Sequence, residues 1–217
     1  MKDPAQHYWS LRLAALKKRL EANNFKVYVA QDASAAGKLV LEEILPALKP
    51  KLISWGGSMT FVETGLYHAL KERKGTEILD TYDQKISAKA MLERRRQGLL
   101  ADVYFTGVNA LTECGQLVNL DMYGNRVAAL TFGPRHVVAL AGRNKIVGDL
   151  DDALFRIKNY AAPTNTLRLD KKTPCVKTGF CEDCVSPDRI CNTWTITEKS
   201  LPKGRIKVVL INQDIGL

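Results

Sequence analysis

Four of the chain's five cysteines fall in one short segment, CVKTGFCEDCVSPDRICN, with the spacing Cys175-x5-Cys181-x2-Cys184-x6-Cys191. A Cys-x2-Cys pair is a natural chelate, because the tight turn between the two residues directs both sulfurs at one metal. Structural zinc sites usually use two such pairs, and this segment has one. Iron–sulfur clusters accept irregular outer spacings around four thiolates. The spacing favours a [4Fe–4S] cluster on these cysteines, with zinc, disulfides and free thiols left open.

Basic residues surround the cysteines in sequence. A cluster with four thiolate ligands carries a net negative charge, which nearby cations would offset. Gly179 and Pro187 suit a backbone that wraps around a metal rather than a regular helix or strand. The neighbouring cations are Lys171, Lys172, Lys177 and Arg189.

A second candidate site is the glycine turn SWGGSMT at 54–60, between a predicted strand and a predicted helix. In parallel α/β folds this position faces the ligand crevice. Gly56 and Gly57 allow a close backbone approach, and Ser58 and Thr60 offer hydroxyl groups to an anion. A plain tight turn with a helix cap explains the same residues equally well, so both interpretations stay open.

Polar side chains are dense in the segment 106–126, which follows the predicted strand ADVYF. Turn-forming residues in a simple loop would give a similar composition, but the density favours a binding site. Glu113 is the candidate nucleophile or general base. The candidate ligand-binding residues are Asn109, Asn119, Asp121, Asn125 and Arg126.

Three further candidates come from the segment 133–147, GPRHVVALAGRNKIV. Arg135, Asn144 and Lys145 lie near glycine bends, where cations can clamp a carboxylate or phosphate. They are equally typical of solvated turns.

These residues require a scaffold, and hydrophobic periodicity predicts an α/β one. An amphipathic helix is expected over 4–23, and the first half then alternates strands with helices. Such alternation predicts a parallel or mixed sheet with flanking helices. In the second half, the β-rich runs between 117 and 147 suggest hairpin-like strands, followed by a helix over 149–161 and a last strand at 204–212.

Length and charge narrow the class of protein. The chain has 217 residues and a formal net charge of +9, enough for one sizeable core. Its basic residues are spread along the chain without interleaved aromatic residues, which argues against nucleic acid as the partner. Anionic small molecules or an acidic partner fit the charge better. No signal peptide or membrane span is evident, so we expect a cytoplasmic protein in which disulfides are rare.

Taken in order, the segments GGSMT, TGVNALTECGQLVNLDMYGNRVA, GPRHVVALAGRNKIV and GFCEDCVSPDRICN resemble the LUD-domain proteins of lactate utilisation. The resemblance implies a fold related to the sugar-phosphate isomerase and CoA-transferase superfamily. It also implies iron–sulfur partner proteins in a system that oxidises lactate to pyruvate. The transferases carry a nucleophilic Glu in a Glu-Asn-Gly or Glu-Ser-Gly turn, and Cys114 in the sequence ECG departs from that pattern.

Two functions follow as expectations. The first is an iron–sulfur redox or accessory protein of lactate (2-hydroxy acid) oxidation. The second is an isomerase- or CoA-transferase-like enzyme that acts on an anionic small molecule, with a zinc-bound cysteine segment serving only structure. The expected organisation is an α/β domain at 1–165, a cysteine-rich segment at 166–200, and a final strand at 201–217 that returns to the core.

Overall fold

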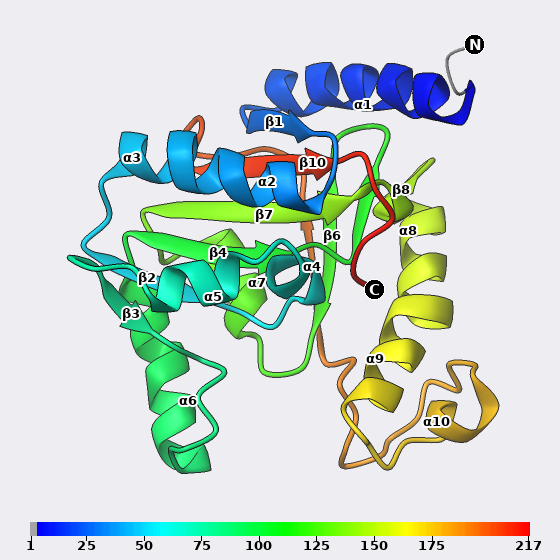
Figure 1. The fold of residues 1–217 in the computed structure, drawn as a ribbon. Helices are drawn as coiled ribbons and strands as arrows, with labels where there is room; N and C mark the ends of the chain where they lie inside the picture. The colour runs from blue at the N-terminus through cyan, green and yellow to red at the C-terminus, as the bar shows by residue number, and fades with distance from the viewer. Residues whose placement is uncertain (1–3) are drawn as a thin grey trace.

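The computed structural model describes residues 4–217, and its centre is a six-stranded sheet in which every neighbouring pair is parallel (Figure 1). The predicted α/β class is therefore confirmed. From one edge to the other, the strands are β1 (Lys26–Ala30), β10 (Ile206–Ile211), β7 (His136–Gly142), β4 (Val103–Gly107), β2 (Leu52–Trp55) and β3 (Glu77–Leu79).

One face of this sheet is covered by helices from the first half of the chain. The rings of Trp55 and Phe105 in the strands pack against Phe61, each with centroids 5.4 Å from that ring. Full burial of such aromatic side chains is among the larger hydrophobic contributions to folding. The covering elements are α2 (Ala33–Leu39), η1 (Val40–Ile44), α3 (Leu45–Leu48), α4 (Met59–Glu63) and α5 (Leu66–Lys71).

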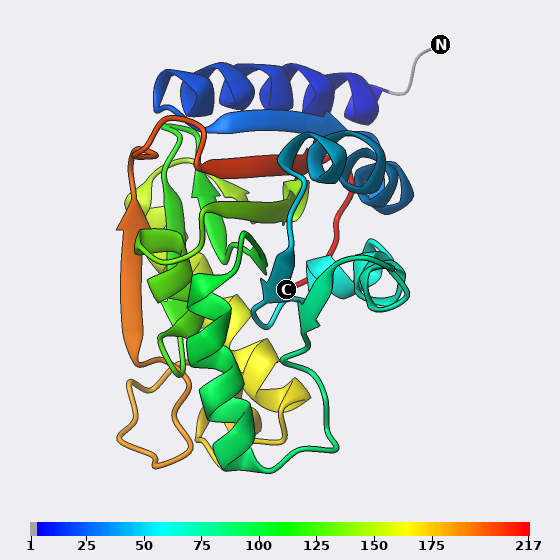
Figure 2. The same cartoon turned by 90° about the vertical axis from the view of Figure 1, so that its left-hand side faces the viewer.

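The opposite face carries the N-terminal helix α1 (Pro4–Ala22), which lies along β1 in both views (Figures 1 and 2). Its buried residues Leu13, Leu16 and Leu20 recur every three or four positions, so they form one apolar stripe against the sheet. The helix α7 (Asn125–Thr131) adds Leu130 to the same core.

A second sheet of four strands packs on this side and is mixed in direction. Its inner cluster joins Val118 and Leu120 to Ala153 and Ile157 of the following helices. In spatial order its strands are β8 (Ile146–Val147), β5 (Ala110–Thr112), β6 (Leu117–Asp121) and β9 (Thr193–Thr197). The helical elements beside it are α8 (Leu150–Arg156), η4 (Ile157–Ala161) and α9 (Ala162–Arg168).

The hairpin expected between 117 and 147 differs from the structure. The antiparallel pair is β5 with β6, whereas 125–131 is helical and 136–142 is a strand of the large parallel sheet. The run HVVALAG is apolar almost throughout, as a parallel strand buried on both faces requires. The helix expected over 149–161 also continues to Arg168, and Pro163 follows directly after the π-helical turn η4.

The remaining elements are short or peripheral: α6 (Ala88–Gln97), η2 (Gly98–Leu100), η3 (Arg143–Lys145) and α10 (Cys175–Thr178). Figure 1 shows α6 and α9 extending to the same side of the large sheet. Over residues 4–217, no helix has the length and apolar character needed to cross a membrane.

Candidate functional site

A cavity of about 410 Å³ opens where the parallel strands end, which is the usual ligand position in open α/β sheets. Each contributing segment follows a strand: Ser58 follows β2, Tyr82 follows β3, Asn109 follows β4 and Lys145 follows β7. The wall across from them comes from α7 and α9. We call this cavity the basic pocket.

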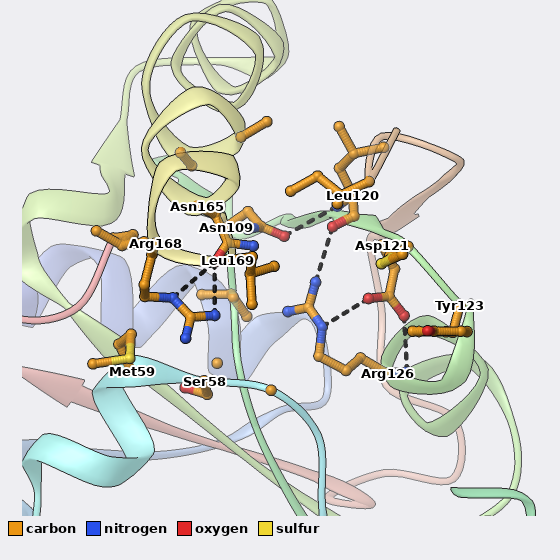
Figure 3. A pocket seen from close by; sticks show the side chains of 18 of the residues that line it. Ser58, Met59, Asn109, Leu120, Asp121, Tyr123, Arg126, Asn165, Arg168 and Leu169 are labelled. Atoms are coloured by element: carbon orange, nitrogen blue, oxygen red, sulfur yellow. Dashed lines mark hydrogen bonds and ion pairs between the residues drawn. The ribbon is translucent and has the colours of Figure 1, made fainter. Parts of the chain in front are cut away.

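Cations dominate the wall of the basic pocket. Asp121 is the acidic side chain among the described lining residues, and it is already paired with Arg126 at 2.9 Å. Figure 3 shows Arg126 and Arg168 directing their guanidinium groups into the pocket from opposite sides. Two guanidinium groups that face one space favour an anion between them. The lining cations are Arg95, Arg126, Lys145, Arg168 and Lys171.

The guanidinium group of Arg126 is held by two hydrogen bonds, and its aliphatic stem packs over Gly56. Its Nε donates to Asp121 Oδ1 at 2.9 Å and its Nη2 donates to the Leu120 carbonyl at 2.9 Å. Neither bond uses Nη1. A Cβ added at Gly56 would lie 2.3 Å from Cγ of Arg126, so glycine at that position is what admits the arginine stem.

Arg168 is oriented by its own helix. Its Nε and Nη2 both donate to Asn165 Oδ1, at 3.0 and 2.8 Å, and this fork also leaves Nη1 unused. Both guanidinium groups are thus oriented before any ligand arrives, which lowers the entropic cost of binding.

Lys145 is the buried cation of the pocket, with 4% of its surface exposed. Its Nζ donates to Thr60 Oγ1 at 2.8 Å. The pKa of Lys145 is lowered to about 7, mainly by burial and then by the charges of Arg156 and Arg126, against the opposing charge of Glu63. Arg156 holds the turn itself, since it donates to the carbonyls of Asn144 and Asn109.

The glycine turn forms both a helix cap and a pocket wall. Ser58 Oγ accepts from the Phe61 N–H at 3.1 Å and caps α4. The Ser58 N–H donates to Tyr82 Oη, which in turn donates to the Gly56 carbonyl. Nothing lies within 4 Å of a Cβ built on Gly57, so this residue faces open space in the pocket.

Seven of the predicted ligand-binding residues line the basic pocket, and five do not. Thr60 contacts Lys145, Asn119 accepts from the Asn109 N–H, and Gly56 lies beneath Arg126. Asn144 bonds to Gly216, and Arg135 is exposed and paired with Asp102. The seven lining residues are Gly57, Ser58, Asn109, Asp121, Asn125, Arg126 and Lys145.

Glu113, the candidate nucleophile, lies outside the pocket wall. It is exposed in the β5–β6 turn and forms an ion pair with Arg12 of α1. Sequence reasoning also missed several lining residues, because they belong to elements remote from the polar loops. These are Tyr82, Arg95, Asn165, Arg168 and Lys171.

Cys175, Cys181, Cys184 and Cys191 all border one small cavity of about 20 Å³, which we call the cysteine cavity. Cys175 Sγ lies 3.3 Å from Thr166 Oγ1 and 3.2 Å from Thr173 Oγ1. The pKa of the Cys191 thiol is raised to about 11, mainly by burial and then by the neighbouring Cys181, against the charges of Lys158 and Arg189.

The thiols are gathered but are not arranged around one point. Within residues 4–217, no group of three or more Cys, His, Asp or Glu side chains has the geometry to hold a single metal ion. Four zinc-bound sulfurs lie about 2.3 Å from the metal and hence within roughly 4 Å of one another. The cysteines therefore share a cavity without forming a ready zinc tetrahedron.

Two cations hold the segment around the cysteine cavity. Arg189 donates to the carbonyls of Cys184 at 2.6 Å and Cys191 at 2.9 Å. Lys158 lines the cavity and pairs with Asp183. The cavity is thus lined by four thiols, by the cations of Lys158 and Arg189, and by the carboxylates of Glu182 and Asp183, and both cations are paired with Asp183.

The two cavities share a wall. Ile190, 6% exposed, lines both of them. On the helical side, Ile157 and Ala161 of η4 face the basic pocket, while Lys158 between them faces the cysteine cavity. One layer of side chains separates the two sites.

The comparisons with known proteins identify the family of the chain. The family model of the LUD domain matches residues 13–211. Among solved structures, the chain is similar to a DUF162 family protein from Deinococcus radiodurans, with 16% identity and a TM-score of 0.49 over 94% of this chain and 98% of that one. No curated protein matches the chain.

Proposed function

Because the chain belongs to the LUD domain family, we propose that it acts in lactate utilisation, as an iron–sulfur redox or accessory protein in the oxidation of lactate or a similar 2-hydroxy acid to pyruvate. The observation that carries this proposal is the wall shared by the two cavities. An anion held in the basic pocket would lie one side-chain layer from the cysteines, with Ile190 between them.

We propose a [4Fe–4S] cluster rather than a zinc ion as the group that these thiols bind. The proposal is supported by the four thiols around one cavity and by the Cys-x2-Cys spacing with irregular outer spacings. Cys175, Cys181, Cys184 and Cys191 would be the ligands. Such a cluster supplies one-electron transfer when bound. Because the present cavity is small, these ligands would have to move outward; Cys181, Cys184 and Cys191 lie in the stretch 179–192 without helix or strand, and Cys175 begins the short helix α10.

The basic pocket supplies the complementary part of the proposal. Arg126 and Arg168 can each offer an unused Nη1 to a carboxylate between them. Charge-assisted bonds of this kind fix the orientation of a small 2-hydroxy acid as well as its position. We further propose a cytoplasmic location and iron–sulfur partner proteins, which would exchange electrons with the cysteine segment.

The test is the metal content of protein purified without oxygen. Iron and acid-labile sulfide are measured, and visible and electron paramagnetic resonance spectra are recorded before and after dithionite. We expect about four irons per chain and a visible absorption that bleaches on reduction. A parallel titration with lactate should show saturable binding to the basic pocket.

A colourless protein that carries one zinc per chain would overturn the iron–sulfur proposal. It would favour the other expectation, an isomerase- or CoA-transferase-like enzyme with a structural metal. Lactate binding would then be compared with that of phosphosugars and acyl-CoAs, since all are anions that a basic pocket can attract.

A further inference from the structure

Lys145 is a buried amine that forms no ion pair within residues 4–217. The residue lines the basic pocket, and its Nζ donates to the neutral hydroxyl of Thr60. Arg126 and Arg156 add positive charge nearby, and Glu63 offsets only part of their effect. Such surroundings favour the neutral amine, which carries the lone pair that a nucleophile needs.

Lys207 shows that burial alone is not what distinguishes Lys145. Lys207 is also 4% exposed, and burial lowers its pKa to about 8. Its Nζ, however, lies 2.9 Å from His136 Nδ1 and 2.7 Å from the Gly204 carbonyl. It lies near the start of β10, away from the pocket at the strand ends. Of these two buried amines, Lys145 faces groups that can hold a substrate.

The geometry of the pocket combines this amine with two anchors for a carboxylate. We propose that Lys145 forms a reversible imine with a small 2-oxo acid whose carboxylate is held by Arg126 and Arg168. The Nζ lone pair attacks the carbonyl carbon, the two N–H protons leave with the carbonyl oxygen as water, and a carbon–nitrogen double bond remains. Addition of water reverses the step, so no oxidant or reductant is consumed.

This inference rests on the proposed function for the carboxylate site and adds covalent chemistry to it. The product of 2-hydroxy acid oxidation is a 2-oxo acid, which has the carbonyl group that its precursor lacks. The pocket would therefore hold the 2-hydroxy acid by its carboxylate alone, and the 2-oxo acid by its carboxylate and by the imine.

The experiment uses the full chain with pyruvate and sodium cyanoborohydride, which reduces an imine to a stable amine. Peptides are then mapped by mass spectrometry. We expect the adduct on Lys145 and none on Lys207, and excess lactate should suppress it by occupying the carboxylate site. Adduct formation should rise as pH increases through about 7, where Lys145 loses its proton.

Three outcomes would overturn the imine: labelling of exposed lysines with Lys145 unmodified, labelling of Lys145 that lactate leaves unchanged, or no labelling at all. Binding of pyruvate and lactate is measured separately by ligand-observed magnetic resonance. Binding without an adduct contradicts the imine and leaves the carboxylate site intact. If neither ligand binds, the proposed function of the pocket fails as well.

A matched pair of variants provides a second test. Lys145→Met removes the nucleophile, so the adduct should be lost, whereas Lys207→Met removes the buried amine outside the pocket and should leave adduct formation unchanged. Should either variant fail to fold, lactate suppression of labelling in the unaltered chain still decides the question.

Discussion

The basic pocket and the cysteine cavity are neighbours that are built in different ways. The pocket is walled by strand ends and helices, and its arginines are already held by Asp121 and Asn165. The cysteine cavity lies mainly in an irregular segment with about 20 Å³ of free space. The pocket is therefore organised without its ligand, whereas the cysteine segment should take its final shape from what the thiols bind.

The largest effect is expected from removing the central cysteine pair. Cys181→Ser combined with Cys184→Ser should abolish metal binding, because these residues supply half of the thiols. Hydrogen exchange should accelerate over 172–192 and stay unchanged in the large sheet. Cys114→Ser is the control, since this exposed cysteine lies in a distant turn. Unfolding of the whole domain in the double variant would remove the contrast between the two regions.

Arg168→Met should weaken the binding of lactate by about 10- to 100-fold, the effect of losing a hydrogen bond to a charged group. Metal content should be unaffected. Arg135→Met serves as the matched control, because Arg135 is exposed and outside the pocket. Isothermal titration measures both variants, and equal affinities in the two would mean that α9 does not hold the ligand.

A smaller effect, roughly tenfold or less in affinity, is expected for Gly56→Ala. The added methyl group would collide with Cγ of Arg126 and displace its guanidinium group, while Gly57→Ala next to it meets open space. Isothermal titration should therefore show weaker lactate binding for Gly56→Ala than for Gly57→Ala. If both behave like the unaltered chain, the position of Arg126 does not depend on the close approach at Gly56.

A last prediction concerns a different quantity, the free energy of unfolding. Lys145 has a folded pKa of about 7 against an ordinary 10.5, so between these values the unfolded chain binds more protons and stability rises with pH. Lys145→Met removes this penalty and should stabilise the protein by ~1–3 kcal/mol at neutral pH. The gain should shrink as pH approaches 10.5. Urea unfolding across this range tests the prediction, and a gain independent of pH would contradict it.

The fold class could be predicted because the first half alternates strand and helix patterns clearly. The error came at 136–142, where a short apolar run looks alike in a hairpin and in a buried parallel strand. Only the pairing with β4 and β10 distinguishes them, and pairing over such distances leaves no local mark in the sequence.

Of the candidate site, the residues that directly follow strands could be anticipated, as Ser58, Asn109 and Lys145 illustrate. Arg168 could not, because it lies at the end of a helix whose orientation depends on packing against the second sheet.

Glu113 is a candidate in the sequence because its segment is rich in polar residues. In the structure, the neighbours Asn109 and Asp121 line the pocket, and Asn119 lies behind the wall and accepts from the Asn109 N–H. Glu113 itself lies outside the pocket.

The position of Ile190 has a consequence for how the two sites affect each other. A side chain that lines two cavities cannot shift for the occupant of one without altering the other. If metal loading changes the affinity of the pocket for lactate, lactate must change the affinity of the cysteines for metal by the same factor, because the two routes to the doubly occupied protein have equal free energies. The occupancy of each site would then depend on the concentrations of both the acid and the metal, through the position of the Ile190 side chain.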